Sequence, residues 1–71
     1  MIKNRLSTIL GERRLSRAEV SRGAGIRYAA VHAMYGGRTT RFDADILDRL
    51  CRYLNVQVGD LLVYVAEEEE G

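Results

Sequence analysis

The 71-residue chain has few of the residues on which cross-links, metal sites and membrane spans depend. It contains one cysteine, one histidine, no tryptophan and no proline. One cysteine cannot form an internal disulfide, and a single cysteine with a single histidine cannot complete a structural zinc site. No apolar run approaches the roughly 18 residues that a membrane span needs. The composition therefore predicts a cytoplasmic protein without cofactor, metal or membrane association.

The sequence also lacks internal repeats and linkers rich in proline or serine. Apolar residues make up 46% of the chain, which is enough for a globular fold and too many for a disordered one. A chain of this length forms one small domain. We therefore expect a single domain over residues 1–66, followed by a disordered acidic tail at residues 67–71.

Charge is divided unevenly along the chain. Residues 1–42 carry nine Lys and Arg against two Glu, a net charge of +7, whereas residues 43–71 have a net charge of −6. A basic half favours a polyanionic partner, but a solvated surface of mixed charge explains the same counts equally well. Arg49 and Arg52 lie in the acidic half, where we expect them to be plain surface residues.

Apolar spacing and capping residues predict five helical segments. They cover approximately residues 3–13, 16–24, 27–35, 43–54 and 58–62. The second segment starts with the letters SRAE, in which Ser16 and Glu19 can form a capping box. The fourth follows Asp43 as N-cap, and its apolar stripe comprises Ile46, Leu47, Leu50, Cys51 and Leu54.

The C-terminal letters LLVYV allow two interpretations. Val63 and Val65 flank Tyr64 with the alternation of a strand, which favours a short strand over an extension of the last helix. Such a strand would pair with the N-terminal letters MIK or with a partner chain.

The second and third predicted helices are short and joined by a tight turn, which is the pattern of a helix-turn-helix unit. Ser21 is small enough for the third helix to pack across it. Gly25 can adopt the positive φ that the turn needs, and Ile26 can fill the corner. Val31 and Met34 form the buried stripe of the third helix.

The opposite face of the third helix carries small and polar residues. They are Tyr28, Ala29, His32, Ala33 and Gly36. A short helix with such a face can enter the major groove of DNA, which is about 12 Å wide.

Together, the run LSRAEVSRGAGIRYAAVHAMYGGR and the following FDADILDRLCRYLNVQVGDLL resemble the Cro/CI-type (XRE-like) helix-turn-helix family. The resemblance covers about residues 6–62. It implies an all-α, five-helix, lambda-repressor-like DNA-binding domain, to which the short C-terminal strand would be an addition. It also implies a bacterial or phage regulator, usually a repressor, that is dimeric on its DNA.

The resemblance assigns roles to particular residues. It implies base-facing positions for Arg27, Tyr28, Ala29, His32 and Ala33. It implies phosphate contacts for Arg17, Arg38, Thr39, Thr40 and Arg41, with Arg17 also bracing the reading helix.

This chain departs from the family pattern in three places. Arg27 is a poor N-cap, at a cost of about 1 kcal/mol of helix stability. The two alanines can contact only a thymine methyl group, so base reading rests on Arg27, Tyr28 and His32 or on DNA shape. For Tyr28, stacking along the backbone and reading a base are equally good interpretations. Leu10 and Tyr35 stand where many members carry an Arg–Glu ion pair.

The predicted function is therefore sequence-specific binding of double-stranded DNA by a homodimeric transcriptional regulator. The alternative is an antitoxin or adaptor with a protein partner, which the apolar letters LLVYV suggest. An enzyme is not expected, because no carboxylate pair, Cys/His set or phosphate-binding loop occurs at a useful spacing.

Overall fold

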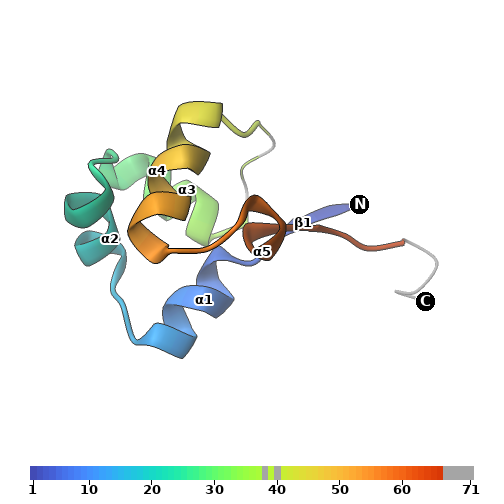
Figure 1. Cartoon of the computed structure of the whole chain (residues 1–71), viewed down its shortest axis with the longest axis horizontal. Coiled ribbons are helices and arrows are strands. Elements are labelled where there is room, and N and C mark those ends of the chain that lie inside the picture. The colour runs from blue at the N-terminus through green and yellow to red at the C-terminus, as the bar shows by residue number, and fades with distance from the viewer. Residues whose placement is uncertain (38, 40, 67–71) are drawn as a thin grey trace.

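The computed structural model describes residues 1–37, 39 and 41–66. In chain order its elements are β1 (Ile2–Asn4), α1 (Leu6–Arg13), α2 (Arg17–Ala24), α3 (Tyr28–Tyr35), α4 (Ala44–Leu54), α5 (Val58–Leu61) and β2 (Leu62–Tyr64). The helices form one cluster, and the two strands lie at one end of it (Figure 1). Over these residues the structure is mostly helical with five helices, and it fits the predicted all-α, five-helix domain only roughly because a small sheet pairs residues 2–4 with residues 62–64.

The first helix begins later than predicted, because residues 2–4 form a strand. β1 and β2 pair antiparallel, with Ile2 opposite Tyr64 and Lys3 opposite Val63. The N–H of Val65 extends the pairing by donating to the carbonyl of Met1 over 2.8 Å. The strand interpretation of LLVYV is confirmed, and its partner is the MIK segment of the same chain.

Asn4 ends the strand and starts the first helix. Its side-chain oxygen accepts from the N–H of Leu6 over 3.0 Å, which supplies the cap that Arg5 does not give. Its side-chain nitrogen donates to the carbonyl of Met34 over 2.9 Å. One amide therefore anchors the C-terminal end of α3 against the start of α1.

The core contains ten buried apolar residues from all five helices and the α2–α3 turn. They are Leu6, Ile9, Leu10, Val20, Ile26, Val31, Met34, Leu50, Leu54 and Leu61. Ile46, Leu47 and Cys51 are half-buried and pack against them, so the predicted stripe of α4 faces the core. Among the residues that the structure describes, no polar or charged residue is buried.

The predicted caps of α2 and α4 are present. Ser16 Oγ accepts from the N–H of Glu19 over 3.0 Å, and Glu19 Oε1 accepts from the N–H of Ser16 over 2.8 Å. The Ser16 backbone N–H, and then its hydroxyl, hold the pKa of the Glu19 carboxyl below its ordinary value of 4.5. Asp43 Oδ1 accepts from the N–H of Asp45 over 3.0 Å.

Within the described part of the chain, we find no helix with the length and apolarity needed to cross a membrane.

Candidate nucleic-acid interface

The α2–α3 pair is built as the sequence predicts. Gly25 ends α2 with φ of 72°, and Ser21 Oγ donates to the carbonyl of Ile26 over 2.5 Å. Ile26 is 6% exposed and fills the corner between the helices. Val31 and Met34 are buried below α3, so the opposite side of α3 faces outward.

Three aromatic rings follow one another along the outer side of α3. Tyr28, His32 and Tyr35 are spaced at i, i+4 and i+7, the spacing of neighbours on one helix face. The rings of Tyr28 and His32 stack with centroids 6.0 Å apart and an interplanar angle of 16°. All three residues are exposed, so these rings form an accessible surface.

Arg17, at the first position of α2, lies against this row of rings. Its guanidinium carbon is 4.9 Å from the centroid of Tyr35, a cation–π contact. Its Nη1 donates to Nδ1 of His32 over 2.8 Å. Neither an aromatic ring face nor a histidine nitrogen that accepts a hydrogen bond supplies a carboxylate charge, so neither contact neutralises the arginine.

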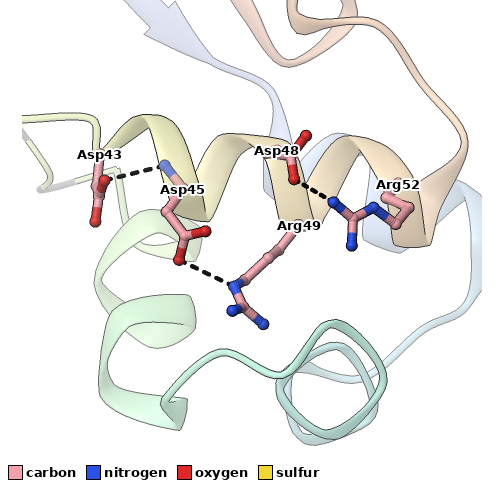
Figure 2. A network of polar contacts seen from close by, with 5 residues as sticks. All are labelled: Asp43, Asp45, Asp48, Arg49 and Arg52. Atoms are coloured by element: carbon pink, nitrogen blue, oxygen red, sulfur yellow. Dashed lines mark hydrogen bonds and ion pairs between the residues drawn. The ribbon is translucent and has the colours of Figure 1, made fainter.

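Ion pairs occur elsewhere in the described residues. Both lie on α4, where Arg49 pairs with Asp45 and Arg52 pairs with Asp48 (Figure 2). Arg17 therefore keeps its positive charge uncompensated by any described carboxylate at ion-pair distance. A guanidinium has five N–H donors, and only one of those on Arg17 is used within the described chain.

The other predicted base-facing residues lie in different surroundings. Ala29 is exposed, but Ala33 is half-buried and lines a small apolar hollow with Met34, Phe42 and Leu47. That burial limits Ala33 to a minor share of any contact surface.

Arg27 is exposed at the start of α3 and caps it without a side-chain hydrogen bond, as expected. It lines a second hollow together with Asp43, Asp45 and Arg49. Because Asp45 pairs with Arg49 there, Asp43 is the carboxylate that reduces the positive potential around Arg27. The structure thus brings Arg17, Tyr28 and His32 together, while Arg27 lies toward the acidic helix.

The predicted phosphate-contacting loop is described in part. Arg41 is exposed and Thr39 is half-buried, whereas Arg38 and Thr40 lie outside the described residues. Gly37 has φ of 75°, so the left-handed residue after α3 is the second glycine of the pair; Gly36 remains right-handed.

The sequence did not predict the contact of Tyr35 with Arg17. From the family pattern, Tyr35 and Leu10 are expected to be an apolar replacement for an ion pair. In the structure Leu10 is 1% exposed in the core, whereas Tyr35 is 38% exposed and carries Arg17 on its ring. The i, i+4, i+7 spacing of Tyr28, His32 and Tyr35 was the signal that could have found it.

The described residues contain no group of three or more side chains that could hold a metal ion. Cys51 is half-buried and is not disulfide-bonded.

Two short helices at a tight glycine turn, with an apolar corner and an exposed second helix, define a helix-turn-helix domain. Comparison with known proteins specifies the kind. Residues 5–67 match the family described as Cro/C1-type HTH DNA-binding domain, and the chain belongs to that family. The family is a class of DNA-binding domains rather than of enzymes.

Two individual proteins are also similar to this chain. One is the Uncharacterized HTH-type transcriptional regulator YozG of Bacillus subtilis (strain 168). It is 29% identical over 66 residues, which cover 93% of this chain and 79% of that protein. The other is a candidate DNA-binding protein from Bacteroides fragilis, known from a crystal structure. The two structures superpose with a TM-score of 0.75 at 19% sequence identity, and the match covers 89% of this chain and 100% of the other chain, which shows a likeness of fold.

Proposed function

We propose that this chain is a cytoplasmic transcriptional regulator that binds double-stranded DNA sequence-specifically, with α3 in the major groove. The observation that supports this most is the outer side of α3, where exposed Tyr28 and His32 lie beside a positively charged Arg17. A donor set of this kind suits base edges and phosphate oxygens. The family membership and the name of the Bacillus subtilis relative support the same function.

The residues divide into two groups in this proposal. Phosphate contacts come from the start of α2 and from the loop after α3: Arg17, Arg38, Thr39, Thr40 and Arg41. Base-facing positions are those of α3 and its N-cap: Arg27, Tyr28, Ala29, His32 and Ala33. Because both alanines lack hydrogen-bonding groups and Arg27 lies near carboxylates, His32 and Tyr28 carry most of the direct discrimination.

The protein acts as a homodimer and most simply as a repressor, over a domain of residues 1–66. A dimer on a pseudo-palindromic site places two α3 helices about one helical turn, roughly 34 Å, apart. Exposed apolar side chains are available for the contact between copies. Ile2 and Tyr64 lie opposite each other in the sheet and are 59% and 72% exposed, and Val58 of α5 is 48% exposed.

The alternative, an antitoxin or adaptor that uses the same fold, rested on the apolar letters LLVYV. Most of that segment is used within the chain, because Leu61 is fully buried and Leu62 and Val63 are half-buried. Only Tyr64 is strongly exposed. The segment therefore favours a protein partner less than its sequence suggested.

Selection of bound sequences from a random pool of duplex DNA tests the proposal. We expect an enriched site with two related half-sites, whose affinity falls steeply as salt rises. Sedimentation of the protein with that site measures the stoichiometry, and a reporter gene carrying the site measures repression. Failure to enrich any sequence, or binding that does not respond to salt, would falsify it.

A further inference from the structure

The contact between Arg17 and His32 determines where the imidazole carries its hydrogen. Arg17 Nη1 lies 2.8 Å from His32 Nδ1, and a guanidinium can only donate. Nδ1 therefore accepts and has no hydrogen of its own. A neutral imidazole has one N–H, so in this arrangement the hydrogen is on Nε2.

Neighbouring rings hold this arrangement in place. Tyr28 stacks on the His32 ring with planes within 16° of parallel, which limits rotation of the imidazole. Tyr35 lies beneath the guanidinium, with 4.9 Å between its ring centroid and the guanidinium carbon of Arg17. The hydrogen bond is thus supported from both ends by aromatic side chains of α3, before any ligand binds.

We infer that Arg17 is a positioning residue that makes His32 a hydrogen-bond donor, through Nε2, toward base edges in the major groove. The inference rests on the proposed function, because it needs α3 in that groove. Guanine presents two acceptors there, N7 and O6, whereas cytosine presents the N4 amino donor. His32 then prefers guanine over cytosine at the base that it contacts. Tyr35 affects this preference indirectly, because its ring holds the Arg17 guanidinium that fixes the tautomer of His32.

The tautomer can be measured directly because His32 is the only histidine in the chain. In the full chain with ¹⁵N-labelled histidine, long-range ¹H–¹⁵N correlations assign the hydrogen to Nδ1 or Nε2. Spectra are recorded at a pH at which titration of the same signals shows a neutral ring. We expect Nε2–H in the wild type and a mixture of tautomers in Arg17→Met. Nδ1–H in the wild type, or no change in Arg17→Met, overturns the inference.

The consequence for base choice is measured by selection from random duplex DNA with matched variants. At one position of each half-site we expect the wild type to prefer guanine over cytosine by about 3- to 10-fold, the range of a single hydrogen bond. The preference disappears in His32→Ala and weakens in Arg17→Met. In Arg41→Met it persists, while affinity falls alike for all sequences, as expected when only a phosphate contact is lost.

Variants of Tyr35 separate positioning from loss of charge. Tyr35→Phe keeps the ring under Arg17 and is expected to keep both the tautomer and the guanine preference. Tyr35→Leu removes the ring but leaves every charge in place, and is expected to weaken both. Thermal unfolding of each variant confirms that it is folded under the conditions of the selection.

The outcomes distinguish the inference from the function on which it rests. If the wild type enriches no sequence, the proposed function fails and the inference fails with it. If the wild type enriches a site whose base preferences are the same in Arg17→Met and His32→Ala, only the inference is overturned.

Discussion

Arg17 of α2 and the two arginines of α4 have opposite surroundings, although both helices lie on the surface of one small domain. On α4, Arg49 Nε is 3.0 Å from Asp45 Oδ2, and Arg52 Nη2 is 2.5 Å from Asp48 Oδ2 (Figure 2). Each of these arginines has a carboxylate one helical turn away. Arg17 of α2 instead contacts a tyrosine ring and a histidine nitrogen.

This difference explains what the division of charge along the sequence means. Exposed i, i+4 pairs stabilise a helix by only about 0.3–0.5 kcal/mol, but they neutralise the charges that take part. An arginine held by neutral groups keeps its charge and most of its donors for an anion. The number of arginines in a segment therefore matters less for DNA binding than the partners those arginines have.

The largest expected effect comes from reversing the charge of Arg17, which has no described carboxylate at ion-pair distance. Arg17→Glu is expected to lower DNA affinity about 10- to 100-fold, because the proposed charge-assisted hydrogen bond to phosphate would be replaced by repulsion. The matched variant Arg52→Glu, on α4, is expected to change affinity less than about threefold, since screening confines surface charges to about 8 Å at physiological salt. Fluorescence anisotropy with the selected site measures both. Equal losses in the two variants would contradict the comparison.

The next largest effect is on stability and concerns Gly25, which ends α2 and lies close to Arg49 of α4. Gly25 has φ of 72°, and a Cβ there would lie 3.0 Å from Nη1 of Arg49. Gly25→Ala is therefore expected to lower the free energy of unfolding by about 1 kcal/mol or more. The control is Gly11→Ala in the interior of α1, where a Cβ would meet nothing within 4 Å. It should raise the free energy of unfolding by up to about 1 kcal/mol. Urea unfolding followed by circular dichroism decides whether the signs differ.

A smaller effect follows from giving Arg17 the kind of partner that the α4 arginines have. In Tyr35→Glu a carboxylate replaces the ring beneath the guanidinium and can pair with it. We expect DNA affinity about 2- to 5-fold below that of Tyr35→Gln, because an exposed ion pair is worth up to about 1 kcal/mol. The difference should shrink as salt rises. If Tyr35→Glu and Tyr35→Gln bind DNA with equal affinity at low salt, then an ion pair on Arg17 does not weaken DNA binding.

Much of the fold could be predicted because its signals are local. The capping box of Ser16 and Glu19 and the left-handed Gly25 involve residues within one turn of each other. The buried pair Val31 and Met34 follows from helical spacing alone. These features suffice to define the helix-turn-helix unit, so its elements were predicted nearly to the residue.

Features that depend on distant pairing were harder to predict. Lys3 was assigned to the first helix although MIK was one of the two predicted partners of the C-terminal strand, because a three-residue strand has too few residues to show alternation and its partner lies about 60 positions away. Asn4 joins that strand to α1 and to the end of α3, and nothing in the local sequence distinguishes it from a surface residue.

The candidate site could be predicted as a set of positions but not as a set of contacts. Arg17 and His32 were both singled out, yet the hydrogen bond between them depends on the angle between α2 and α3. Tyr35 was considered only together with Leu10, since the family pattern pairs its position with the first helix, so its contact with Arg17 was not predicted. Spacing along one helix says which side chains share a face, whereas contacts between helices need the three-dimensional arrangement.

The smallest predicted effect concerns Glu19, the carboxylate nearest in sequence to Arg17. Its oxygen accepts from the N–H of Ser16, so this acid is engaged by the backbone and not by the arginine. That bond lowers the pKa of Glu19 from 4.5, so the folded state favours the ionised form. The resulting stabilisation is complete above the unfolded-state pKa and is lost as pH falls through the folded-state pKa.

Glu19→Gln tests this, because glutamine can still form a capping box but does not titrate. The free energies of unfolding of wild type and variant are measured from pH 7 down to pH 3. The wild-type value minus the value of the variant should be constant near neutral pH. Below about pH 4.5 it should decrease, because the wild type loses this stabilisation and the variant has none to lose. DNA affinity at pH 7 should be the same in both proteins, since this carboxylate does not pair with Arg17. A pH-independent difference would mean that Glu19 is not held by the cap. A gain in affinity in the variant would mean that Glu19, contrary to the comparison of α2 with α4, neutralises Arg17 in the wild type.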